Sequence, residues 1–285
     1  MALGATPPEP LPADPNLIAV LKQRCVYKPE YCGIMSVAFS PDGKLLAAAG
    51  DDGTVRLWDL ASRQPLGDTM KGHTNRIRGL AFSPDGKLLA SASKDGTVRL
   101  WGVATRQPSG DPLEAHSGTL ESVAFSPDGK LLASASVKDK TLRLWDVATR
   151  KPSGSPMVGH TGGVGTVAFS PDGRKLASAG DDGVRLWDMA SRHLLGDALK
   201  GHDAPVWSVT FSPNGKMLAS AGDDGTARLW DVTSRRQLGE PLTGHTGFVW
   251  SEAFSPDGKV LASASDDGTV RLWDVTRILS HTASH

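Results

Sequence analysis

The residues of this 285-residue chain with the potential for chemistry are histidines, serines and aspartates that recur together. The stretch from Gly244 to Asp274, GHTGFVWSEAFSPDGKVLASASDDGTVRLWD, contains one such set, and closely similar stretches precede it. A catalytic triad occurs once and lies in a pocket, whereas this set recurs five times in register. Repetition of this kind is typical of structural residues. The sequence therefore predicts no catalytic residues and a protein that is not an enzyme.

Other common chemistries also lack a motif. His193, His281 and His285 are outside the repeated pattern, one in an expected outer strand and two in the C-terminal tail, so we expect no metal site. Asp-Asp-Gly segments are sufficiently explained as turns without bound calcium. Neither a nucleophile elbow nor a phosphate-binding loop occurs. Cys25 and Cys32 are expected to be free thiols, and no cofactor is predicted.

Charge and hydropathy exclude two classes of partner. The chain has 31 basic and 31 acidic residues, so it lacks the net positive charge that favours nucleic-acid binding. No run of about 18 apolar residues occurs, and the N-terminus has no secretory pattern, so no membrane association is expected. Two cysteines and no disulfide framework favour a cytoplasmic protein, which we expect to be a monomer.

The recurring residues lie in a unit of about 43 residues that predicts β-strands. Trp-Asp or a close variant stands at Trp58-Asp59, Trp101-Gly102, Trp145-Asp146, Trp187-Asp188, Trp230-Asp231 and Trp273-Asp274, with spacings of 43, 44, 42, 43 and 43 residues. Strands are predicted at 76–83, 88–93 and 98–103, with a weaker outer strand within 106–116. Ser-Pro-Asp-Gly and Asp-Gly supply the turns between them. The fold class is all-β.

A single unit of this size cannot bury both faces of its sheet, so packing of successive units and closure into a ring are expected. We predict one domain over 17–285 with six repeats at about 29–275, after a disordered or linker tail at 1–16. A short helix or an irregular entry at 16–22 and a strand near 23–28 are expected, the strand completing the last unit and closing the ring. A seven-bladed or incomplete ring is the alternative.

Six in-register copies of a pattern that combines Gly-His, Ser-Pro-Asp-Gly, Asp-Gly and Trp-Asp, with substitutions in individual copies, resemble the WD40 repeat family of β-propellers. The resemblance implies four antiparallel strands per blade and one buried hydrogen-bonded chain of His, Ser, Asp and Trp in each. By register these are His73, Ser91, Asp95, Trp101; His116, Ser134, Asp139, Trp145; His160, Ser178, Asp182, Trp187; His202, Ser220, Asp224, Trp230; and His245, Ser263, Asp267, Trp273. Repeat one departs from the pattern, with Ala48 where the others have serine. The near-identical copies are similar to the arrays found in bacterial signalling proteins.

The resemblance also implies which residues face the top entrance of the ring and contact partners. Carried over by position, they are Met35, Asp51, Arg76, Arg78, Lys94, Glu121, Lys138, Asp181, Trp207, Asp223, Phe248, Trp250 and Asp266. Trp207 and Trp250 are the two tryptophans outside the Trp-Asp register, and exposed tryptophan beside charge is typical of an interaction hot spot. The alternative is that both indoles pack over the channel.

These residues favour a protein–protein interaction scaffold that binds a protein or peptide on its top face. A partner segment with basic and apolar residues is expected on the side of Trp207 and Trp250. Two alternatives remain open at the level of sequence. One is a propeller that binds a small molecule or catalyses a reaction in the central channel. The other is a designed or fragmentary repeat array with no ligand of its own.

Overall fold

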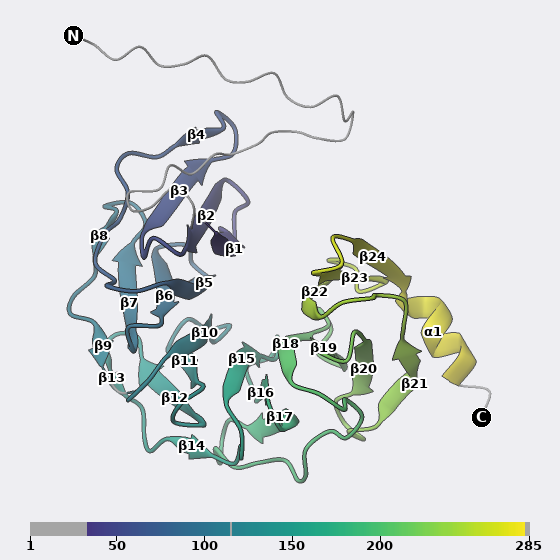
Figure 1. The fold of residues 1–285 in the computed structure, drawn as a ribbon. Helices are drawn as coiled ribbons and strands as arrows, with labels where there is room; N and C mark the ends of the chain where they lie inside the picture. The colour runs from purple at the N-terminus through teal and green to yellow at the C-terminus, as the bar shows by residue number, and fades with distance from the viewer. Residues whose placement is uncertain (1–32, 115, 283–285) are drawn as a thin grey trace.

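Six antiparallel β-sheets follow one another along the chain and lie side by side around an arc (Figure 1). The structure is a computed structural model that describes residues 33–114 and 116–282. The first strand of each sheet lies on the inner side of the arc, and the later strands lie progressively outward (Figure 1). This arrangement is an all-β, six-bladed propeller built on four antiparallel strands per blade, of which the described residues of blade six supply three.

The strand bounds repeat from blade to blade. Blade one contains β1 (Ile34–Phe39), β2 (Leu45–Gly50), β3 (Val55–Asp59) and β4 (Gln64–Pro65), and blade two contains β5 (Ile77–Phe82), β6 (Leu88–Ser93), β7 (Thr97–Gly102), β8 (Gln107–Pro108) and β9 (Leu113–Glu114). Blade three contains β10 (Leu120–Phe125), β11 (Leu131–Ser136), β12 (Thr141–Asp146), β13 (Lys151–Pro152) and β14 (Met157–Val158), and blade four contains β15 (Val164–Phe169), β16 (Lys175–Gly180) and β17 (Gly183–Asp188). Blade five contains β18 (Val206–Phe211), β19 (Met217–Gly222), β20 (Ala227–Asp231) and β21 (Gln237–Leu242), and blade six contains β22 (Val249–Phe254), β23 (Val260–Ser265) and β24 (Val270–Asp274). In blade four, isolated bridges from Leu194 and Leu199 to β17 mark the outer strand.

The turn between the first two strands shows why Ser-Pro-Asp-Gly recurs. In blade one the Ser40 hydroxyl donates to the Asp42 carboxylate at 2.7 Å, and the Lys44 amide donates to the same oxygen at 3.1 Å. Gly43 has φ of 68°, a conformation that residues with a Cβ adopt only at a cost. The hydroxyl and amide contacts also lower the pKa of Asp42. The four residues therefore close the hairpin with their own side chains.

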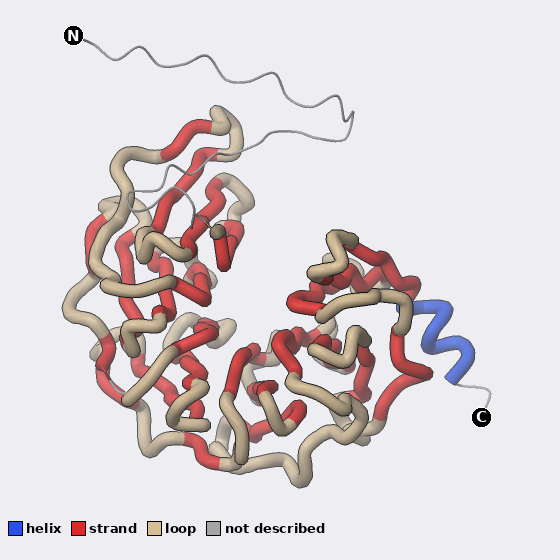
Figure 2. The backbone as a smooth tube through the Cα atoms, in the orientation of Figure 1, coloured by secondary structure: helices blue, strands red, loops and turns tan. Residues whose placement is uncertain are grey.

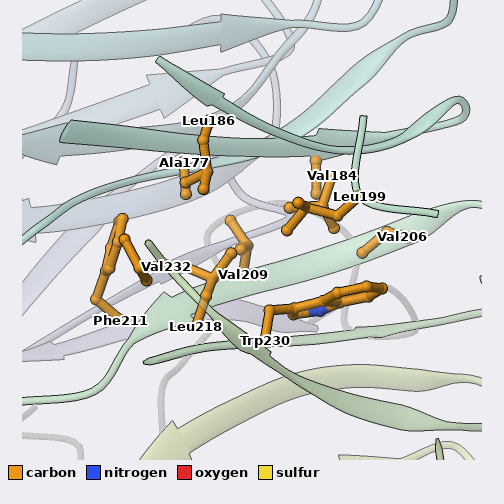
Figure 3. Packing of buried hydrophobic residues seen from close by; sticks show 11 residues of the cluster. Ala177, Val184, Leu186, Leu199, Val206, Val209, Phe211, Leu218, Trp230 and Val232 are labelled. Carbon is orange, nitrogen blue, oxygen red and sulfur yellow. The ribbon is translucent and has the colours of Figure 1, made fainter. Parts of the chain in front are cut away.

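The hydrophobic core lies between neighbouring blades. Figure 3 shows one interface, where side chains of β16 and β17 in blade four face side chains of β18, β19 and β20 in blade five. Its buried members are Ala177, Ala179, Val184, Leu186, Leu199, Val206, Val209, Phe211, Leu218, Trp230 and Val232. Equivalent clusters form between the other consecutive blades. Each blade therefore depends on its neighbours for burial, as expected for a repeat protein.

The predicted strands agree with the observed ones to within about one residue, and the outer edge differs most. The segment 106–116 forms two short strands, β8 and β9, which both pair with β7. After the last repeat the chain forms a helix, α1 (Val275–Thr282), which packs beside β21 through Val275, Ile278 and Leu279. Figure 2 shows that the rest of the described chain consists of strands, turns and loops.

The arc has an opening between blade one and blade six (Figure 1). Val37 and Phe39 of β1 are 58% and 65% exposed, and Val270 and Leu272 of β24 are 67% and 72% exposed. The same positions in the internal blades are buried or partly buried. The predicted tail, the helix at 16–22, the closing strand at 23–28, Cys25 and Cys32 all lie outside the described residues. Ring closure by that strand therefore stays a prediction.

Candidate partner-binding site at the inner-strand bulges

Each inner strand contains one extra residue relative to its partner strand. In blade two the pairing passes from Ile77 to Gly79, which leaves Arg78 between two successive pairs of the ladder. The same irregularity occurs in all six blades, and the extra residues are Met35, Arg78, Glu121, Gly165, Trp207 and Trp250. A β-bulge redirects the side chain of its extra residue and often lies next to a functional site.

The six bulge residues line one cavity of about 370 Å³, which we call the bulge pocket. Lys94 and Val137, from the turns after β6 and β11, complete its lining. All six blades contribute, and the contributions differ in size and charge. A larger cavity of about 690 Å³ lies between blades three and four, but most of its lining residues belong to the repeated turn motif. The bulge position, by contrast, holds methionine, arginine, glutamate, glycine or tryptophan, depending on the blade.

Blades five and six form the aromatic side of the bulge pocket. The ring centroids of Trp207 and Trp250 are 5.5 Å apart, and Phe248 meets Trp250 edge-on at 5.9 Å. The Trp207 indole N–H donates to the Asp223 carboxylate, and this indole is half-buried. Trp250 is 47% exposed and Phe248 is 43% exposed. Trp207 is therefore partly packed over the pocket, whereas Trp250 keeps nearly half of its surface exposed.

Blades one to three form the charged side. The Arg78 guanidinium lies between Glu121, at 3.4 Å from Nε to a carboxylate oxygen, and the Met35 sulfur, at 3.4 Å from Nη1. Lys94 lines the cavity beside this pair. An aromatic side thus faces a side that contains two cations and one carboxylate.

The other residues predicted for the top face lie outside the lining of the bulge pocket. They are Asp51, Arg76, Lys138, Asp181, Asp223, Phe248 and Asp266. Arg76 pairs with Asp51 at 3.2 Å. Asp181 accepts the amide of Gly163 at 2.8 Å, and Lys138 donates to the Ser117 carbonyl at 3.4 Å. The side chain of Asp266 is exposed. Phe248 and Asp223 contact the pocket indirectly, through Trp250 and Trp207.

The repeated polar residues are brought together inside blades two to six. In blade two, His73 Nδ1 lies 2.8 Å from Asp95, His73 Nε2 lies 2.7 Å from Ser91, and the Trp101 indole N–H donates to Ser91 at 2.9 Å. The four following blades have the same contacts. Each serine hydroxyl lies between an indole and an imidazole, which leaves it unavailable as a nucleophile directed at a pocket.

The pKa shifts in these chains have a structural cause. Burial lowers the pKa of His116 and His160, even though the hydrogen bond to the partner carboxylate acts in the opposite direction. Burial opposes ionisation of Asp224, but hydrogen bonds from His202 and Thr226 outweigh it and lower the pKa to about 2. Burial therefore favours the neutral imidazole at His116 and His160, and the hydrogen bonds favour the ionised carboxylate at Asp224.

Sequence reasoning missed Glu252, which lies in the core at the interface of blades five and six. The corresponding residues of the other inner strands are apolar: Val37, Leu80, Val123, Val167 and Val209. Burial raises the pKa of Glu252 to about 8, although the Ser208 hydroxyl acts in the opposite direction. The sequence contained the signal, because SEAF in the last repeat places a glutamate where the other repeats have valine or leucine.

Within residues 33–114 and 116–282, no three His, Cys, Asp or Glu side chains lie close enough together to hold a metal ion. No helix in that part of the chain has the length and apolar character needed to cross a membrane.

Repeated four-stranded blades joined by inter-blade cores define a β-propeller. The WD domain, G-beta repeat family matches this chain at residues 22–59, 65–102, 108–146, 151–188, 194–231 and 236–274. The chain therefore belongs to the WD40 repeat family. Propellers of this family commonly mediate protein interactions and are generally non-enzymatic scaffolds.

Proposed function

We propose that this propeller is a scaffold that binds a peptide or protein segment at the bulge pocket, on the side of Trp207 and Trp250. The observation that supports this most is the exposure of Trp250 and Phe248 in a cluster with Trp207, at positions where the six blades differ. Large aromatic side chains kept in water cost solvation free energy unless a partner covers them, and tryptophan is enriched among the residues that dominate binding energy.

The partner segment carries apolar and basic residues on this side. An apolar side chain buries area against the indole of Trp250. A lysine or arginine of the partner gains from the face of an exposed indole. It also gains from the carboxylates of Asp223, which contacts Trp207, and of Asp266, whose amide donates to the Phe248 carbonyl. Asp266 has an exposed side chain, whereas Asp223 already accepts the Trp207 indole N–H.

The proposal is tested by capture of partners from the native lysate with the intact chain and with the Trp207→Ala, Trp250→Ala double variant. We expect the double variant to lose captured partners by about tenfold or more, because hot-spot residues contribute about 2 kcal/mol or more each. Trp250→Ala alone, which removes the more exposed indole, is expected to retain the melting temperature of the parent chain.

Val158→Ala is the matched control, because Val158 is 72% exposed on an outer strand away from the pocket. This variant is expected to capture the same partners as the parent chain. Equal capture by the Trp250→Ala variant and the parent chain would refute the proposed site.

A further inference from the structure

We infer that the bulge pocket contains a subsite for a carboxylate next to an apolar side chain, with Lys94 as its cation. This inference rests on the proposed function of the same pocket and extends it to the chemistry of the opposite side. The partner would then place a carboxylate over blades two and three while its apolar side chain contacts Trp250.

Among the charged side chains that line the pocket, which are Arg78, Lys94 and Glu121, one cation has no anionic partner. Arg76 is paired with Asp51, and Arg78 is paired with Glu121. Within residues 33–114 and 116–282, the Lys94 ammonium has neither a hydrogen-bond nor an ion-pair partner. With Arg78, Lys94 and Glu121, the lining of the pocket has a net charge of +1. An anion in this half-enclosed space gains more electrostatic free energy than it would at an open surface.

The same charges favour a carboxylate over a phosphate. One carboxylate brings the net charge of the lining to zero. A phosphate near neutral pH carries up to two negative charges, which would leave excess negative charge close to Glu121. The neighbouring walls are apolar, since Met35, Val137, Trp207 and Trp250 make up the remaining side chains. A carboxylate attached to an apolar residue therefore pairs with Lys94 while its apolar side chain buries area against the neighbouring walls.

Gly165 keeps the space between the two sides open. A Cβ placed there would lie 3.4 Å from Cε3 of Trp207, which is ordinary contact, and the backbone of Gly165 does not have positive φ. Alanine would therefore be tolerated at this position. A leucine would extend into the pocket or displace the Trp207 ring, so Gly165→Leu is a blocking variant that leaves Lys94 and Trp250 in place.

The test uses four fluorescein-labelled peptides with one Gly-Ser spacer and fluorescence anisotropy as the readout. The first ends in leucine with a free carboxylate, and the second is its C-terminal amide. The third contains Asp-Leu with an amide end, so that its carboxylate comes from a side chain. The fourth contains Lys-Leu with an amide end and tests the proposed function alone.

We expect the first or third peptide to bind at least about tenfold more tightly than the second, and this preference to weaken as salt is added. Lys94→Gln is expected to abolish the preference. Lys87→Gln is the matched control, because this lysine of the same blade is 82% exposed, pairs with Asp85 and lies outside the pocket lining. Gly165→Leu is expected to weaken all four peptides.

Three outcomes would overturn the inference: equal affinity for acid and amide peptides, equal effects of Lys94→Gln and Lys87→Gln, or no binding of either acid peptide at millimolar concentration. Competition by inorganic phosphate as strong as that of the first peptide, without loss in the Trp250→Ala variant, would identify a phosphate site and overturn it too. Binding of the fourth peptide that depends on Trp250 but not on Lys94 would leave the proposed function intact.

Discussion

Glu252 shows how one residue can depart from the repeat without belonging to the bulge pocket. Its carboxyl group lies among inter-blade side chains at a position that is valine or leucine in the other five blades. Neither carboxyl oxygen makes a hydrogen bond of normal geometry within the described residues. A buried polar group without a partner lowers the free energy of unfolding.

Replacing Glu252 with valine is expected to stabilise the protein in a pH-dependent way. The pKa is raised from 4.5 to about 8 in the folded state, so the folded chain holds the proton more tightly than the unfolded chain. Below about pH 4.5 both states are protonated and ionisation contributes nothing. Between pH 4.5 and 8 the unfolded chain ionises first, and the cost to the wild type grows to the order of 3–5 kcal/mol.

The measurement is urea unfolding of the wild type and Glu252→Val across pH 4 to 9. Glu252→Gln is the control, because it removes the titration but keeps a polar group in the core. A stability difference between Glu252→Val and the wild type that does not change with pH would contradict the account.

The role of the serine in the buried hydrogen-bonded chains can be tested by removing it from one blade and by adding it to blade one. Ser178→Ala removes the oxygen that accepts the Trp187 indole N–H and contacts His160, so we expect a loss of about 2–4 kcal/mol in unfolding free energy. Blade one already has Ala48 at this position, buried near Trp58. Ala48→Ser is therefore expected to raise the unfolding free energy by about 1 kcal/mol. Denaturant titration measures both, and stabilisation by Ser178→Ala would contradict the assigned role.

At the scale of the element, the bulge places a buried core residue and an exposed residue next to each other in one strand. Val249 is fully buried between blades, while the next residue, Trp250, is the extra residue of the bulge and is 47% exposed. The two neighbours therefore have different roles although they lie in one strand. The bulge residue is free to differ among blades because it forms no regular pair with the second strand.

This separation leads to a paired prediction. Trp250→Gly, which gives blade six the residue that blade four has at Gly165, is expected to change the unfolding free energy by less than about 1 kcal/mol. Val249→Ala removes buried methyl groups and is expected to cost about 2–3 kcal/mol. Thermal unfolding of both variants measures the difference. Comparable destabilisation by the two substitutions would show that the bulge residue belongs to the core.

The elements that could be predicted from the sequence are those fixed by local chemistry. Ser-Pro-Asp-Gly turns and alternating strands set the hairpins, and the sequence located β6 at the bounds that the structure shows. The bulges could not be predicted, because a one-residue shift in pairing depends on the partner strand. For the same reason the sequence predicted both Arg76 and Arg78 for the top face. In the structure only Arg78 lines the pocket, whereas Arg76 pairs with Asp51. The helix α1 was also missed, since its apolar face gains stability only against β21.

At the scale of the whole molecule, the blades are joined by arginines as well as by cores. Arg150 has positive φ and donates from Nη1 to the carbonyl of Ser109 in the preceding blade at 3.0 Å. Arg192 and Arg235 make the equivalent contacts to Ser153 and Leu195. Arg63 occupies the same turn of blade one with the same positive φ, which places it where a preceding blade would accept its hydrogen bond.

The matches to the family indicate which segment completes the ring. The later matches begin at 65, 108, 151, 194 and 236, at or next to residues of an outer strand on the preceding blade. The first match begins at residue 22, so the same register predicts that residues 23–28 add an outer strand beside β24. The ends of the arc would then meet and cover Val37, Phe39, Val270 and Leu272, each worth about 1.5–3 kcal/mol when fully buried.

Two truncations test this prediction. Removing residues 1–16 is expected to leave the melting temperature unchanged, because that segment is predicted to be a tail. Removing residues 1–28 is expected to lower the unfolding free energy by several kcal/mol and to increase binding of a hydrophobic dye, since the faces of β1 and β24 would lose their cover. Light scattering after gel filtration checks for association through those faces. Equal stability and equal dye binding in the two truncations would mean that residues 17–28 do not close the ring.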